Sequence, residues 1–100
     1  MIKGTTPTHI FTLPVDAETI KTIRIIYAQG GIERVTKGNE HCSLDGNRVE
    51  CRLTQEDTFT FQEGECVEVQ VRVLLNTGEA LASQVMRVHC RECLSDEVLA

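Results

Sequence analysis

The residues best suited to chemistry lie near the end of the chain, in the run His89-Cys90-Arg91-Glu92-Cys93. A Cys-x-x-Cys pair can chelate zinc or act as a redox dithiol, and His89 could add a third metal ligand. A closed zinc site needs four ligands, and a redox dithiol is expected within a βαβ unit, for which the chain has no pattern. We therefore interpret Cys90 and Cys93 as small hydrophobic residues at a strand end, and we expect no metal and no cofactor.

Two further cysteines, Cys42 and Cys51, fall on the two arms of a predicted hairpin. A turn at Asp45-Gly46 matches the strongest hairpin signal, whereas a turn at Gly46-Asn47 pairs apolar residues and places the two cysteines opposite each other. We favour the second register. A disulfide between directly opposed cysteines would be strained and labile, and thiols are expected in a cytoplasmic protein. The sequence alone leaves open whether the pair is bridged.

The remaining polar residues do not predict an active site. The three histidines are far apart in the sequence, and no serine lies in a nucleophile elbow. Glu56 and Asp57 are adjacent carboxylates, but acidic residues after Thr54 are typical of the first turn of a helix. We expect no enzymatic activity.

Composition limits the class of protein. A chain of 100 residues with 41% hydrophobic residues is expected to form one folded domain. A formal charge of −5 argues against a nucleic-acid partner, because phosphate binding needs a concentrated basic face. No apolar run is long enough to cross a membrane, and the first residues lack the features of a signal peptide. We expect synthesis in the bacterial cytoplasm, no secretion by a signal peptide, and association with a virion.

The most regular pattern predicts a long hairpin between Cys66 and His89. Valines at every second position from 67 to 73 indicate a strand with one buried face. Asn76-Thr77-Gly78 provides a three-residue loop, with Gly78 free to adopt positive φ. We expect the cross-strand pairs Val69–Val85, Val71–Ser83 and Val73–Leu81, a bulge near Met86, and a central position for this hairpin in the fold.

Further strands are expected at short intervals along the chain, with no helical periodicity of any length. They cover residues 9–13, 20–29, 32–37, 41–44 and 48–53, with a strand fragment at Phe59-Thr60-Phe61 and one helical turn near 54–58. This spacing predicts an all-β, single-domain, immunoglobulin-like antiparallel sandwich of about seven or eight strands. Residues 1–8 would form an N-terminal arm and residues 94–100 a C-terminal tail.

Several stretches together resemble a family of small proteins encoded by phages and prophages of Gram-positive bacteria. The likeness extends over nearly the whole chain, and it is carried by residues 1–14, 23–29, 53–58, 69–73, 78–83 and 93–99. The chain is also similar, more loosely, to the N-terminal sandwich domains of phage baseplate proteins. These resemblances imply a structural or tail-associated role, and they bring no catalytic residues with them.

We accordingly expect a non-enzymatic phage structural or tail-accessory protein that binds other virion or tail proteins or further copies of itself. The arm, the tail and the exposed strand edges would make these contacts. A phage-encoded inhibitor of a host protein is an alternative. A zinc site at His89, Cys90 and Cys93 is another. A carbohydrate-binding module is disfavoured, because the chain has no tryptophan and one tyrosine.

Overall fold

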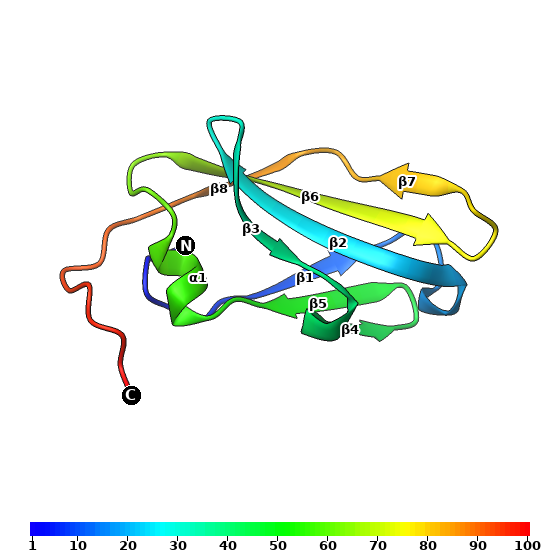
Figure 1. Ribbon diagram of the computed structural model, residues 1–100, viewed down its shortest axis with the longest axis horizontal. Coiled ribbons are helices and arrows are strands. Elements are labelled where there is room, and N and C mark those ends of the chain that lie inside the picture. The colour runs from blue at the N-terminus through cyan, green and yellow to red at the C-terminus, as the bar shows by residue number, and fades with distance from the viewer.

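Two antiparallel sheets pack face to face in the computed structural model, which describes residues 1–100 (Figure 1). The larger sheet has the order β3-β2-β6-β7, with β8 also paired to β6, and the smaller sheet has the order β1-β5-β4. The predicted all-β sandwich is confirmed. The strands are β1 (Thr8–Thr12), β2 (Ile20–Gln29), β3 (Ile32–Lys37), β4 (Cys42–Asp45), β5 (Arg48–Arg52), β6 (Cys66–Leu75), β7 (Ala80–Ala82) and β8 (Met86–His89). Three short helices connect them: η1 (Ala17–Thr19), η2 (Asn39–His41) and α1 (Gln55–Phe59).

The two long strands β2 and β6 form the centre of the larger sheet. They pair antiparallel from Ile20–Leu75 to Ala28–Glu68, and their inward faces supply most of the buried core. Both strands alternate as the sequence predicts, with Ile23, Ile25 and Tyr27 fully buried on β2. The expectation that β6 and its return strand would form the central pair was wrong. The return strand lies at the sheet edge because β2 takes the other side of β6.

The return strand of the long hairpin is divided by an irregularity. Val73 faces Leu81 as predicted, but Val69 faces Met86 and not Val85, so the register shifts by one residue between β7 and β8. This is the bulge that the change of hydrophobic phase indicated. The loop before β7 also has the predicted form. Gly78 has φ of +90° and its N–H donates to Leu75 O at 2.9 Å.

The hairpin of β4 and β5 adopts the register that pairs apolar residues. Cys42 faces Cys51 and Leu44 faces Val49, so the turn consists of Gly46 and Asn47. Gly46 has φ of +59° and no residue other than glycine has positive φ. A glycine with positive φ at the first turn position is typical of a type II′ turn, whose twist matches that of the flanking strands. This choice places both cysteines on the inward face.

The helical turn α1 begins as predicted, after Thr54. The Thr54 hydroxyl accepts from the Asp57 N–H at 3.1 Å, and the Asp57 carboxylate accepts from the Thr54 N–H at 2.9 Å. This reciprocal pair is a capping box. The expected strand at residues 59–61 was wrong. Phe59 ends the helix, whereas Phe61 turns into the core and packs against Tyr27 with ring centroids 6.1 Å apart.

The N-terminal segment is bound to the body of the protein along its length. Ile2 forms a parallel bridge with Arg91, and the Thr58 hydroxyl accepts from the Gly4 N–H at 2.8 Å while donating to Thr5 O at 2.9 Å. The C-terminal residues extend away from the sandwich, as Figure 1 shows, and Leu94 is fully exposed. Of the two ends of the chain, the tail is therefore the one that projects from the fold.

The capping box supports a test of helix stability. Replacing Thr54 with alanine leaves the Asp57 N–H without its acceptor, so we expect the free energy of unfolding to fall by about 1 kcal/mol. Urea denaturation followed by circular dichroism measures this change. The same truncation at Ser95, in the exposed tail, serves as the control. An equal effect of Thr54→Ala and Ser95→Ala would contradict the capping role.

Candidate functional site

A chain of polar side chains lies between the two sheets, in an interior that is otherwise apolar. Tyr27 of β2 is fully buried, and its hydroxyl lies 2.7 Å from Nδ1 of His9 on β1. His9 faces Cys51 in the register of β1 with β5, and Cys51 faces Cys42 in the register of β5 with β4. The Tyr27 hydroxyl also acts on Cys51, whose pKa it lowers. We call these four residues, His9, Tyr27, Cys51 and Cys42, the interior polar cluster.

Alternation along the strands explains how the cluster forms. Phe11 and His9 share the inward face of β1, as Val49 and Cys51 share that of β5. The smaller sheet thus points His9 and both cysteines toward the larger sheet, where Tyr27 occupies an inward position. The His9 and Tyr27 rings pack with centroids 5.6 Å apart. A tyrosine so deeply buried needs a hydrogen-bond partner, and His9 provides it.

The acid–base properties of the cluster follow from burial and from shared hydrogen bonds. Burial raises the pKa of Tyr27 above its ordinary value, so the phenol stays protonated. Burial also lowers the pKa of His9, aided by the positive chain terminus, which favours the neutral imidazole. The hydrogen bond from Cys42 lowers the pKa of Cys51 to about 7 despite burial, and the Tyr27 hydroxyl and Lys37 charge contribute.

The same hydrogen bond acts in the opposite direction on Cys42. It raises the pKa of this thiol, and burial and the charge on Cys51 add to the effect. When the pair loses one proton, the negative charge is therefore held mainly on Cys51, with Cys42 as the hydrogen-bond donor. Such a pair behaves as one titrating unit with a shared proton.

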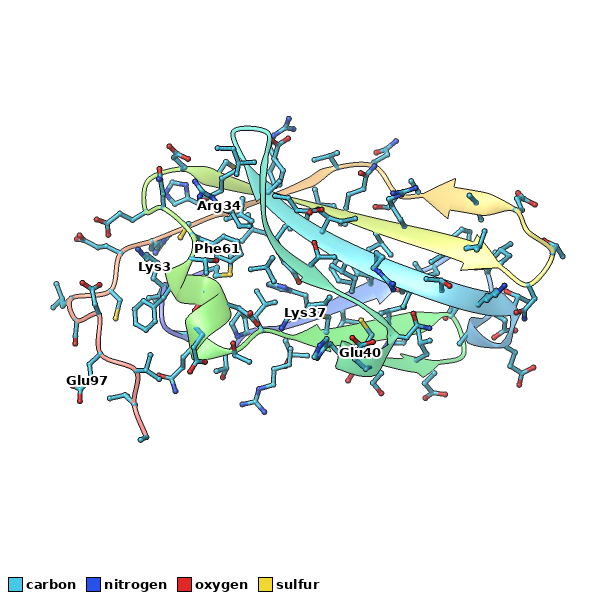
Figure 2. The ribbon with its side chains drawn as sticks, in the orientation of Figure 1. Lys3, Arg34, Lys37, Glu40, Phe61 and Glu97 are labelled. Atoms are coloured by element: carbon cyan, nitrogen blue, oxygen red, sulfur yellow. The ribbon has the colours of Figure 1, made fainter.

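An ion pair borders this cluster. Lys37, labelled in Figure 2, lies at the end of β3. Its Nζ is 2.7 Å from Oδ2 of Asp57 on α1, and only 11% and 19% of the two side chains are exposed. Burial opposes ionisation of Asp57, but hydrogen bonds from Lys37 and Thr54 outweigh it and hold its pKa below the ordinary value. The interaction ties α1 to β3 beside the cysteine pair, and the Lys37 charge favours a thiolate at Cys51.

The residues singled out near the end of the chain differ in their surroundings. Cys90 is fully buried, whereas His89 and Cys93 are exposed. No group of three or more His, Cys, Asp or Glu side chains is arranged to hold a metal ion. All five cysteines are free thiols in the structure.

Sequence reasoning missed the Lys37–Asp57 pair and the His9–Tyr27 contact. The sequence does indicate a partner for Lys37. This residue lies two positions after the inward Val35, so it also points inward, and a buried cation requires a partner. Asp57 was interpreted only as a helix-turn residue, a role that it also has. The His9–Tyr27 contact depends on how one sheet lies over the other, which no local pattern encodes.

Comparison with models of protein families, with curated proteins and with solved structures finds no match for this chain. No helix in the structure has the length and apolar character needed to span a membrane.

The ion pair predicts how stability depends on acid. Because the pKa of Asp57 is lowered in the folded state, its ionised form stabilises the fold above its ordinary pKa of 3.8, and that contribution is lost as the pH falls through the lowered value. Lys37→Met removes the cation, so we expect lower stability at neutral pH and a smaller further loss on acidification. Thermal unfolding between neutral pH and pH of about 2 measures both.

The matched control is Arg48→Met, which removes the cation of an exposed pair in which Arg48 lies 3.8 Å from Glu50. Exposed pairs contribute little to stability, so this variant should unfold much as the wild type does at every pH. Equal behaviour of Lys37→Met and Arg48→Met would contradict a stabilising role for the buried pair.

Proposed function

We propose that this chain is a non-enzymatic phage or prophage structural protein, a tail-accessory or baseplate-like module that acts through contacts with other proteins. The observation that carries the proposal is an unpaired strand edge at β1, next to an apolar face of the larger sheet that the smaller sheet does not fully cover. An exposed strand edge is a template for pairing with another chain, and many assembly proteins use it in this way.

The free edge of β1 follows from its hydrogen bonds. The Leu53 N–H donates to Pro7 O at 3.0 Å, and the Leu13 N–H donates to Asn47 O at 2.7 Å. In an antiparallel ladder these bonds recur at every second residue, so residues 9 and 11 also bond to β5. The backbone groups of Thr8, Ile10 and Thr12 then point away from β5, where the sheet has no further strand.

The apolar face beside this edge arises from the unequal width of the sheets. The larger sheet has five strands and the smaller sheet three, so part of the inner face near β7 has no strand opposite. A shallow apolar groove lies there, between the segment that follows β1 and the edge of the larger sheet. It is lined by Leu13, Pro14, Val15, Val71, Val73, Leu81, Ala82 and Ser83. An extended partner segment added to β1 would bring its inward side chains toward this groove.

Other exposed apolar residues support a role in assembly. Leu94, Val98 and Leu99 of the projecting tail are exposed, and the Gln55 side chain bonds to the backbone of Leu99 at 2.8 and 3.0 Å. Ile10 on β1 is 52% exposed. The only tyrosine is buried in the core, which disfavours a carbohydrate-binding surface built on aromatic rings.

Strand addition at β1 can be tested with Ile10→Pro. Proline removes an N–H that makes no bond in the fold, and it suits an extended edge strand, so the variant should keep the wild-type unfolding midpoint. The variant should nevertheless fail to enter particles. The partner strand would find no N–H at position 10 to bond to one of its carbonyls, and it would meet the proline ring. Mass spectrometry of phage particles purified from a host that carries the gene measures incorporation.

Ile10→Thr is the matched control, since it removes apolar surface but keeps the N–H and a high strand propensity. We expect Ile10→Thr to be incorporated more fully than Ile10→Pro. Absence of the wild-type protein from purified particles would overturn the structural role. Incorporation of a folded Ile10→Pro variant at the level of the wild type would overturn the proposal that β1 is the docking edge, but not the structural role.

A further inference from the structure

The hydrogen-bond pattern of the smaller sheet determines how Cys42 and Cys51 face each other. Cys51 lies two residues from Leu53 and pairs with His9, so its N–H and C=O point toward β1. They consequently point away from β4. Cys42 and Cys51 are therefore a non-hydrogen-bonded pair of β4 and β5, the kind of position at which facing side chains come closest.

The spacing at such a position is compatible with a disulfide. Non-hydrogen-bonded pairs have Cα atoms about 4.5 Å apart, and disulfides join residues whose Cα atoms are about 4.4–6.8 Å apart. The distance lies at the short end of this range, so the bond would form with strain and would be readily reduced. Both side chains lie on the inward face, where each thiol shifts the pKa of the other.

Solvent reaches the Cys42–Cys51 pair from one side only. Cys51 is fully buried under the larger sheet, whereas Cys42 is half-buried and lies on β4, which is an edge strand. A small oxidant therefore reaches Cys42 first, and Cys51 is positioned behind it. None of the other three cysteines has a cysteine opposite it; Cys66, for example, faces His89.

We propose that Cys42 and Cys51 form a reversible oxidation site, in which hydrogen peroxide converts the two thiols to a cross-strand disulfide. Cys42 is the residue that attacks peroxide, and Cys51 is the residue that resolves the product. The Tyr27 hydroxyl, which lies 2.7 Å from Nδ1 of His9, and the positive charge on Lys37 both act on Cys51.

The oxidation of the two thiols by one peroxide proceeds in two steps. The pair first loses one proton to solvent, and transfer of the remaining proton from Cys42 to the Cys51 thiolate gives the minor form with the charge on Cys42. In this form the more accessible Cys42 thiolate attacks one peroxide oxygen, so that an S–O bond forms and the O–O bond breaks. The departing hydroxide takes the Cys51 proton and leaves as water. The Cys51 thiolate then attacks the Cys42 sulfur, the S–S bond forms, and the S–O bond breaks with release of a second hydroxide that is protonated by solvent. Two thiols are oxidised and one peroxide is reduced to two waters.

The test uses the full chain with the exposed residues Cys66 and Cys93 replaced by serine, which prevents crosslinks between molecules. The folded protein is treated with hydrogen peroxide, remaining thiols are alkylated after denaturation, and the chain is cut with trypsin. Cleavage after Lys37, Arg48 and Arg52 separates the two cysteines onto peptides 38–48 and 49–52. We expect these peptides to be joined, lighter by two hydrogens than their sum, and released by dithiothreitol.

Two alanine variants assign the roles of the sulfurs. Cys51→Ala should leave Cys42 without a resolving partner, so Cys42 should accumulate as sulfinic acid at the same peroxide dose. Cys42→Ala should leave the buried Cys51 as an unmodified thiol. The circular dichroism spectrum of each variant establishes that it is folded. Sulfinic acid at Cys42 without joined peptides in the parent protein, or joined peptides that form only in denaturant, would overturn the proposal.

Discussion

The pairing of β2 with β6 is the interaction on which the rest of the fold depends. These two strands of ten residues run side by side along the molecule, and their inward faces carry a continuous row of valine, isoleucine and tyrosine side chains. Burial of this surface is the main favourable contribution to folding, because each such side chain contributes about 1.5–3 kcal/mol when removed from water. The remaining elements are arranged to cover this face or to extend its edges.

The inner face of the larger sheet is covered unequally at its two ends. Near one end, Phe61, Cys90 and the N-terminal residues close over β6 and β8, and Gln29 secures the connection by bonding to the N–H and O of Gln62 at 2.8 Å each. Near the other end the segment after β1, with Leu13 and Val15, lies beside β7. The unequal width of the two sheets thus produces both a stable core and an apolar groove beside an unpaired strand edge. This combination supports a role in protein assembly.

The interior polar cluster is a second consequence of the smaller sheet. Its three strands present a histidine and two cysteines to the buried Tyr27, and the hydrogen bond with His9 satisfies the Tyr27 hydroxyl. Apolar side chains can also fill such an interior at native density. The cluster instead provides a facing pair of thiols with a shared proton, next to the Lys37–Asp57 ion pair. The proposed oxidation site lies on β4 and β5, whereas the proposed docking edge lies on β1 at the other side of the smaller sheet.

Much of this architecture could be predicted from the sequence, because it depends on local rules. Alternation of valines identified β6, a cap and acidic residues identified α1, and the pairing of apolar residues identified the Gly46-Asn47 turn and the cysteine register. The tertiary structure decided what lies beyond each strand: that β2 pairs with β6, that Phe61 enters the core, and that His9 meets Tyr27. The physical reason is that alternation reveals which face of a strand is buried, but not which strand covers it. Contacts between sheets join residues far apart in the chain, so only the complete packing arrangement brings them together.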